Sequence, residues 1–384
     1  MEGSWLSRGP LKIKGGLEAG WMNRSNIYLS NTNEVSDNIY QIMPSIGLHH
    51  DFTETSYWSL AYYGTFAFYQ DYTDNNWDST FVPFDFYLGG KTGPFVELSN
   101  DFWYSSDPYG SQDLYNLGIK TRRTQNTTFL GPGWTFSEKT KAQVYGRYIY
   151  LDYANDQDQW QNQREWQTGA IFYYKFWPKT SALFQYTYAS RDYPDQPSSF
   201  SENQTRNDFY VGLTWDATSK LQGTAKLGYG FLDYDNQYNA AGQQYQAKNT
   251  WLAEIDVSWN LSPKLVLNGA LWRALRQSTE GVDVNGLYPS NYFVDTFGLL
   301  GVNWTFLRNL TAFANAGYGR NEYNSLDGSP SRDDDIFRGQ VGLRYSFLKY
   351  LYVQGYYFYD YRDSNYDYYS YTDNVFYAGI GGSF

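Results

Sequence analysis

Two adjacent histidines, His49 and His50, carry the only imidazole groups in a chain of 384 residues that contains no cysteine. Adjacent side chains of a strand point to opposite faces, so we expect one ring on each face and no metal ion held between them. Without cysteine, the chain has no thiolate zinc site, iron–sulfur cluster or covalently attached haem. His49 also lacks a nearby Gly-x-Ser-x-Gly motif that would supply an esterase nucleophile. The sequence therefore predicts neither a metal nor another cofactor.

Paired carboxylates are the second group with possible chemistry. Glu254 and Asp256 stand two residues apart on one face of a predicted strand, which places their carboxylates about 7 Å apart. That separation is compatible with a glycosidase, but a hydrated polar wall explains the pair more simply. We therefore expect no enzyme.

Composition narrows the class of protein. Aromatic residues make up 21% of the chain, which argues against disorder, yet the chain is polar on average. No stretch approaches the roughly 20 apolar residues of a membrane-spanning helix. The net charge of −11 argues against binding to nucleic acid. The opening MEGSWLSRGP has no apolar core of a signal peptide, so we expect that an export signal has been removed.

The elements that position these residues are predicted to be strands. Apolar and polar residues alternate from Leu11 to the end, most clearly in WLAEIDVSWNL, residues 251–261. The alternation predicts an all-β chain of about 18 antiparallel strands, with 16 as the alternative, over residues 11–384 after an N-terminal periplasmic segment at 1–10. Residues 114–136 look like one over-long strand, with a bulge predicted near 123–128.

The predicted connections fall into two alternating classes. One class is short and carries a lysine or arginine, as in FWPKTSALF and WNLSPKLVL, whereas the other is long, polar and often acidic, as in SLDGSPSRDDD. Short turns at one end and long loops at the other are typical of an up-and-down outer-membrane barrel, whose short turns are periplasmic and whose long loops are extracellular.

The two faces of the strands indicate which side meets water. A barrel of 16 to 18 strands leaves an aqueous lumen, so the apolar face should point to lipid and the polar face inward. Aromatic residues recur just before the short turns and suit a girdle at the membrane interface. They are Trp134, Phe176, Trp215, Trp259, Trp304 and Phe347.

The chain from Leu11 to its end resembles a Gram-negative outer-membrane β-barrel, and its last residues, FYAGIGGSF, are similar to the terminal signature of that class. Phe384 matches the final aromatic residue; the apolar set behind it is Phe376, Ala378 and Ile380, whereas Gly382 departs from the pattern. The resemblance implies that Phe384 is an assembly signal and that the last strand pairs with the first. It also implies an outer-membrane location, with outer-membrane lipid, lipopolysaccharide and the barrel assembly machinery as partners.

The polar register supplies the residues predicted to line the lumen. The basic residues are Lys12, Lys14, Lys120, Arg122, Arg147, Lys175, Arg191, Lys226, Arg276, Arg338, Arg344 and Arg362. The acidic residues are Glu18, Asp85, Glu97, Asp101, Glu165, Asp208, Glu254, Asp256, Asp295 and Asp360. The aromatic residues are Tyr63, Tyr69, Tyr87, Trp103, Tyr210, Trp272, Tyr356 and Phe358. Charged rings in a pore set ion preference, and aromatic rings offer sugar rings an apolar face. A balanced, solvated wall explains the charges equally well.

Strand count, tyrosine-rich strands and the lack of a plug resemble the porins found with exopolysaccharide and capsule export systems; the alginate-export porin is a more distant analogue. The resemblance implies a passive pore for a secreted polysaccharide and a periplasmic polysaccharide-export protein or scaffold docked at the short-turn rim. Three alternatives remain open: a general or solute-specific diffusion porin, a barrel sheath for a partner multihaem cytochrome, and a soluble secreted carbohydrate-binding β-protein.

Overall fold

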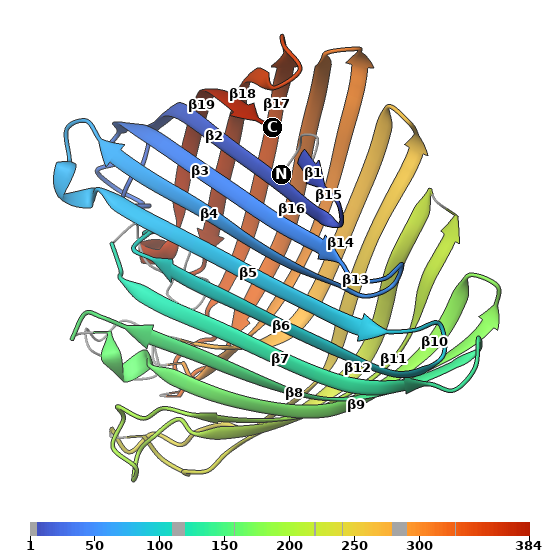
Figure 1. The fold of residues 1–384 in the computed structure, drawn as a ribbon. Coiled ribbons are helices and arrows are strands. Elements are labelled where there is room, and N and C mark those ends of the chain that lie inside the picture. Colours follow the sequence, from blue (N-terminus) through green and yellow to red (C-terminus); the bar gives the residue numbers. More distant parts are fainter. Residues whose placement is uncertain are drawn as a thin grey trace.

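The computed structural model describes residues 6–109, 120–156, 158–218, 220–239, 241–278, 290–326 and 328–384 (Figure 1). The strands are β1 (Leu6–Arg8), β2 (Leu11–Arg24), β3 (Asp37–Asp51), β4 (Tyr57–Tyr69), β5 (Trp77–Gly89), β6 (Gly93–Ser105), β7 (Arg123–Thr135), β8 (Thr140–Tyr153), β9 (Gln163–Trp177), β10 (Thr180–Asp192), β11 (Gln204–Thr218), β12 (Leu221–Tyr234), β13 (Lys248–Ser262), β14 (Leu265–Gln277), β15 (Tyr292–Leu307), β16 (Leu310–Tyr323), β17 (Asp333–Ser346), β18 (Leu351–Ser364) and β19 (Tyr371–Ser383). Three 3-10 turns are η1 (Thr73–Asn75), η2 (Gln159–Gln161) and η3 (Asp367–Tyr369). Among the described residues, no helix has the length and apolarity needed to cross a bilayer.

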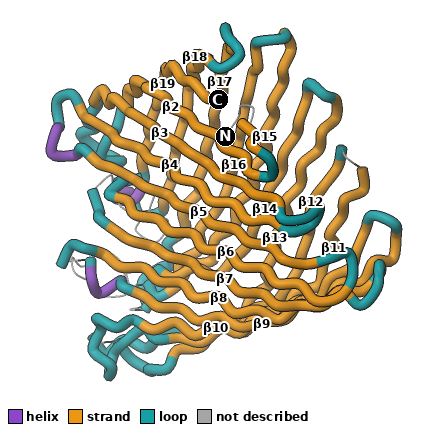
Figure 2. The backbone as a smooth tube through the Cα atoms, in the orientation of Figure 1, coloured by secondary structure: helices purple, strands orange, loops and turns teal. Residues whose placement is uncertain are grey.

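Eighteen antiparallel strands, β2 to β19, close into a barrel, which confirms the predicted fold and excludes the 16-strand alternative. Each strand pairs with the next along the chain, and β19 pairs with β2 from Val375↔Arg24 to Ser383↔Gly16. Figure 1 shows the first and last strands side by side. Figure 2 shows the long connections and the 3-10 turns at one end of the barrel. We call this the long-loop end, and the opposite end the short-turn end.

The alternation in the sequence becomes two faces of the wall. The outer register carries apolar side chains that are widely exposed, such as Val211 (61%), Leu227 (60%) and Leu300 (72%). In a membrane these side chains meet lipid, and closure leaves no unpaired strand edge there. The residues of the predicted girdle lie on this outer register beside the short turns.

Part of the N-terminal segment belongs to the sheet. The short strand β1 pairs with β2, from Leu6↔Ile13 to Arg8↔Leu11. Gly9 lies between the two strands with a φ of +65°, a left-handed conformation that glycine adopts without strain.

The predicted over-long strand at 114–136 is wrong. Strand β7 begins at Arg123 and pairs with β6 and β8 without a register shift, so residues 123–128 contain no bulge. Residues 120–122 belong to the connection before β7, and residues 114–119 lie outside the described residues.

The wall separates between β13 and β14 at the long-loop end. β13 pairs with β12 as far as Lys248, but its pairing with β14 stops at Ala253↔Arg273. Beyond that point Leu275 continues the outer register of β14, yet it is buried in a cluster with Leu232 of the lumen register. The end of β14 therefore turns inward and packs against the inner face of β12.

Candidate functional site: the lumen of the barrel

The lumen wall contains the predicted polar register. The predicted lining residues that lie on strands all share the inner register in the strand pairing, opposite the exposed apolar residues. Lys120 and Arg122 differ, because the structure places them in the β6–β7 connection rather than on a strand. There the ammonium of Lys120 donates a hydrogen bond to the backbone oxygen of Asn76. Which of these side chains act on a transported molecule stays a prediction.

The histidines lie on opposite faces, as predicted. His49 faces the lumen, where its Nε2 is 2.9 Å from Asp51, whose other oxygen is 2.6 Å from the Lys12 ammonium. His50 faces outward, with its ring 6.1 Å from that of Trp58. Among the described residues, no three His, Asp or Glu side chains are grouped to hold a metal ion.

Two rows of aromatic rings cross the lumen face of β4, β5 and β6. The lower row, toward the short-turn end, joins Tyr57, Tyr87 and Phe95, whose neighbouring centroids are 6.2 and 6.1 Å apart. The upper row joins Tyr63, Phe81 and Trp103, with neighbouring centroids 6.1 and 5.9 Å apart. We call these six rings the aromatic track.

Three rings of the aromatic track are open to the lumen, whereas Phe95 is buried. Tyr57, Tyr63 and Trp103 keep 37%, 37% and 40% of their surface exposed, so a molecule in the lumen can lie against them. Asp85 and Asp101 stand between the two rows on the same register, and Asp85 accepts a hydrogen bond from Ser59. The wall thus alternates apolar rings with carboxylates, the pattern that the faces and the edges of a sugar require.

A second polar cluster lies across the closure of the barrel. Glu18 on β2 accepts hydrogen bonds from Tyr352 (2.5 Å), Gln354 (2.7 Å) and Tyr377. The Tyr377 ring stacks on Tyr356 at 4.7 Å. These contacts join β2, β18 and β19 from inside, so Glu18 stabilises the closure as well as lining the lumen.

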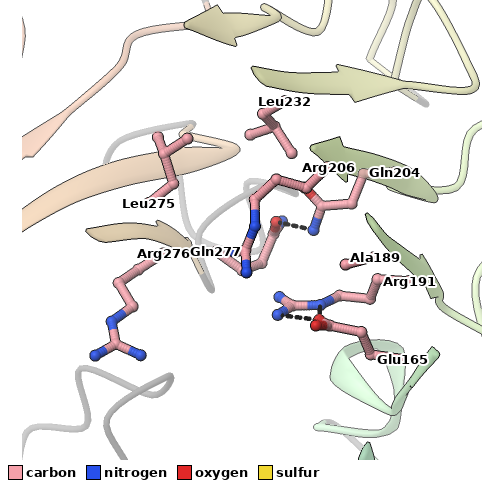
Figure 3. Close-up of a pocket in the computed structure, with 9 residues that line it drawn as sticks. All are labelled: Glu165, Ala189, Arg191, Gln204, Arg206, Leu232, Leu275, Arg276 and Gln277. Carbon is pink, nitrogen blue, oxygen red and sulfur yellow. Dashed lines mark hydrogen bonds and ion pairs between the residues drawn. The ribbon is translucent and has the colours of Figure 1, made fainter. Parts of the chain in front are cut away.

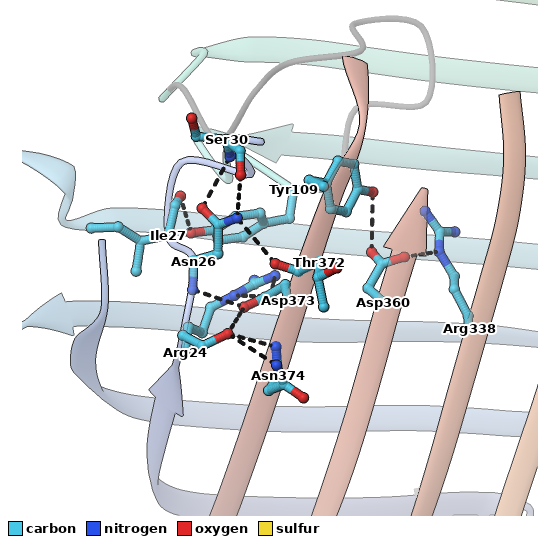
Figure 4. A network of polar contacts seen from close by, with 12 residues as sticks. Arg24, Asn26, Ile27, Ser30, Tyr109, Arg338, Asp360, Thr372, Asp373 and Asn374 are labelled. Atoms are coloured by element: carbon cyan, nitrogen blue, oxygen red, sulfur yellow. Dashed lines mark hydrogen bonds and ion pairs between the residues drawn. The ribbon is translucent and has the colours of Figure 1, made fainter. Parts of the chain in front are cut away.

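The long-loop end holds charged pairs that are fully enclosed. Arg24 donates to Asp373 at 2.9 and 2.5 Å, and Arg332 donates to Asp334 at 2.9 and 2.6 Å. The side chains of Arg332, Asp334 and Asp373 have no exposed surface. Figure 4 shows Asp373 among Arg24, Asn26 and Asn374, with Arg338 and Asp360 nearby.

The β6–β7 connection reaches this network. Tyr109 donates a hydrogen bond of 2.6 Å to the backbone oxygen of Ile27, and its hydroxyl is 3.2 Å from that of Tyr69. The Arg24 guanidinium lies 3.4 Å from the centre of the Tyr109 ring. A residue from beside β6 therefore contacts the end of β2, with three strands between them, so the start of this connection reaches inward across the wall.

Another enclosed network lies where β14 turns inward. Gln204 donates to Gln277 at 2.9 Å (Figure 3). Gln277 in turn donates to Glu202 at 2.7 Å. Arg191 pairs with Glu165 at 2.5 Å beside them. The cavity among these residues measures about 20 Å³, room for about one water molecule, so it is too small for a sugar.

The pair Glu254 and Asp256 occupies the lumen register, and Glu254 forms an ion pair with Lys226 at 2.7 Å. Sequence reasoning missed several other lumen residues. Those that the structure adds are Arg24, Tyr57, Phe81, Phe95, Lys141 and Tyr377. The first five stand an even number of residues from a predicted one on the same strand, so strict counting by two would have found them. Tyr377 lies on β19, where no lining residue was predicted.

A closed barrel with a lipid-facing apolar surface and a polar lumen defines the class of outer-membrane channel-like barrels. The comparisons agree: the profile of the putative beta-barrel porin 2 family matches residues 3–384, so the chain belongs to that family. This places the protein in the outer membrane of a Gram-negative bacterium.

Solved structures are similar to this chain at low sequence identity. A BenF-like porin from Pseudomonas fluorescens Pf-5 has a TM-score of 0.50 at 12% identity, over 97% of this chain and 99% of that one. The outer membrane protein opdK from Pseudomonas aeruginosa has a TM-score of 0.48 at 13% identity, again over 97% and 99%. The ferric citrate transporter FecA has a TM-score of 0.46 at 12% identity, and the match spans 92% of this chain but only 60% of the transporter. A search of curated proteins gave no match.

Proposed function

We propose that this porin is a passive conduit through which a secreted polysaccharide leaves the cell. The aromatic track carries the proposal, because it lines one wall of the lumen with two rows of rings, of which Tyr57, Tyr63 and Trp103 are exposed. Such rings hold a sugar by its apolar face without a fixed pattern of hydrogen bonds, so a chain can move along them. A periplasmic polysaccharide-export protein would dock at the short-turn rim and deliver the polymer.

The test is planar-bilayer recording with a neutral oligosaccharide, maltoheptaose, as the probe. We expect transient blocks of the ion current, shortened about tenfold or more when Tyr63, Phe81 and Trp103 are all changed to alanine, because each ring contributes roughly a kcal/mol. The matched control changes Phe66, Phe84 and Phe102, on the outer face of the same three strands, to alanine. Blocks that are absent from the unmodified protein, or equally long in both variants, would overturn the proposal.

A diffusion porin is the second candidate, and the inward contact of Tyr109 favours it. Diffusion porins often narrow their lumen with an inward-folded loop, and Tyr109 ties the β6–β7 connection to Ile27. This candidate predicts a steady current without sugar blocks, and a larger current after Tyr109→Ala. Membership of a porin family contradicts the soluble alternative. A cytochrome sheath needs a separate haem protein, and no contact of the described residues points to one.

A further inference from the structure

Charge is distributed unevenly along the barrel axis. Each short turn from residues 90–92 onward carries a cation, whereas the long connections are rich in carboxylates. The cations are Lys91, Lys139, Lys179, Lys220, Lys264, Arg308 and Lys349. Carboxylates of the long connections include Glu34, Asp71, Asp74, Asp156, Asp158, Asp195, Asp235 and Asp367. A protein with a net charge of −11 therefore presents a basic rim on its periplasmic side.

Four lysines converge in one sector of that rim. Lys91, Lys139, Lys141 and Lys175 line a hollow of about 580 Å³ at the turns that follow β5, β7 and β9. Its other lining residues are Thr135, Ser137, Glu138, Thr140, Tyr173 and Ser181. We call this hollow the lysine vestibule. It contains four cations and hydroxyl groups, but a single carboxylate.

The lysines of the vestibule are not used in ion pairs. None of the four lies within 4.0 Å of a carboxylate oxygen of the described residues, whereas Lys12 and Lys226 elsewhere on the wall are paired at 2.6 and 2.7 Å. Four lysines share the single lining carboxylate of Glu138, with Glu97 acting on Lys141 from the wall, so positive charge is in excess and the arrangement suits a ligand that brings several negative charges. The serine and threonine hydroxyls add hydrogen-bond donors for the oxygens of such a ligand.

Two of the lysines point away from lipid. Lys141 and Lys175 stand on the lumen register, opposite Tyr173 and Ser181 in the strand pairing. The Lys141 ammonium lies 4.2 Å from the centre of the Phe95 ring, which begins the aromatic track. Phe95 itself is buried, so a chain that leaves the vestibule meets the exposed ring of Tyr57, in the same row, next. The lumen register turns both lysines away from phospholipid head groups outside the wall.

From this geometry we infer that the lysine vestibule is the periplasmic entrance site for an acidic polysaccharide, whose carboxylates bind the lysines while its sugar rings pass to the aromatic track. The inference rests on the proposed function and adds the charge of the polymer. Attraction at the mouth raises the rate of capture, and the carboxylates of the long loops at the far end discourage the polymer from returning.

The experiment compares oligogalacturonate with maltoheptaose of the same length, each added to the short-turn side of the full-length protein in a planar bilayer. We expect oligogalacturonate to block at least tenfold more often at low salt, with a frequency that falls as salt rises. Changing Lys91, Lys139, Lys141 and Lys175 to glutamine should remove that excess and leave the blocks by maltoheptaose unchanged. The matched control removes four rim cations outside the vestibule, Lys179, Lys264, Arg308 and Lys349, and should keep most of the excess.

Three outcomes would overturn the inference. Equal losses in the two quadruple variants would assign the effect to the whole rim rather than the vestibule. Altered insertion into phosphatidylglycerol vesicles with unaltered blocks would assign the lysines to lipid. Blocks by maltoheptaose that depend on the aromatic track, without any excess for oligogalacturonate, would refute the acidic substrate and leave the conduit standing. If neither sugar blocks, the conduit fails together with the vestibule.

Discussion

Charged side chains differ in burial and in ion pairing between the two ends of the lumen. At the long-loop end, Arg332 and Asp334 are paired with no exposed surface, and the Arg332 guanidinium lies 3.3 Å from the centre of the Tyr369 ring. At the short-turn end, Lys91 and Lys139 are exposed, and neither forms an ion pair with a described carboxylate.

The difference separates structural charge from charge that is available to a ligand. A buried charge must be paired, because removal from water costs several kcal/mol per ion, so the arginines of the long-loop end are committed to their partners. A charge in water can remain without a partner until a ligand arrives. A charge on the lumen register is therefore not by itself a sign of a binding site. Its burial and its ion-pair partners determine whether it is available to a ligand.

The largest effect is expected from breaking a buried pair. Asp334→Ala leaves Arg332 enclosed without its bidentate partner, and we expect a loss of about 3–5 kcal/mol in the free energy of unfolding. Asp333 is the matched control on the outer face, where its pair with Arg320 is partly exposed (35% and 49%) and is worth about 0–1 kcal/mol. Urea unfolding in lipid vesicles measures both. Equal losses in the two variants would contradict the distinction between the ends of the barrel.

The next effect concerns pH at the long-loop end. Burial raises the pKa of Glu202, in the β10–β11 connection, to about 8 from an ordinary value near 4.5. The carboxyl of Glu202 therefore binds its proton more tightly when the β10–β11 connection is packed against the barrel than when it is free in water. Packing of the connection is strongest below about pH 4.5, and it weakens as the pH rises through 8. A shift of this size corresponds to a few kcal/mol, at about 1.4 kcal/mol per unit.

Hydrogen exchange of residues 193–203 between pH 5 and 9, corrected for the intrinsic exchange rate, measures this docking. We expect Glu202→Gln to keep the hydrogen bond to Gln277 as a neutral group and to show no such loss of protection at high pH. Asp195→Asn in the same connection serves as the control and should keep the pH dependence of the unmodified protein. A wild-type connection with uniform protection across this range would refute the prediction.

A smaller effect is expected at the short-turn end, where the chain closes the barrel. The backbone of Phe384 exchanges two hydrogen bonds with Gly15, at 3.2 and 3.0 Å, and the Phe384 ring covers Gly15. A Cβ on Gly15 would lie 2.5 Å from that ring, so Gly15→Ala must displace it, at a cost of about 1 kcal/mol, the low end for overpacking, because the ring is 45% exposed and can shift. Gly146→Ala is the control, since nothing lies within 4 Å of its Cβ position. Heat modifiability on gels should drop for the first variant only.

The fold was largely predictable, because an apolar stripe facing lipid leaves a period-two pattern on every strand. The closure was predictable too: residues 376–384 alternate up to Phe384, and β19 pairs with β2 as expected. Gly382, the departure from the terminal signature, faces outward opposite Leu351, and a Cβ there would lie 2.9 Å from the Leu351 side chain. The site was less predictable, since partners depend on distant contacts. Nothing local in the sequence shows that Tyr109 reaches Ile27 or that Gln277 reaches Glu202.

The smallest effect is expected from breaking an exposed ion pair. Lys12 and Asp51 form an ion pair at 2.6 Å near the short-turn end, but both side chains are well exposed, at 36% and 40%. Lys12→Ala should therefore change the free energy of unfolding by less than about 1 kcal/mol, and less still at high salt, because water and ions screen the pair. Asp51 keeps its contact with His49 in that variant, at 2.9 Å. A loss as large as that of Asp334→Ala would show that pairing, rather than burial, determines what a lumen charge contributes, and the contrast between the two ends would fail.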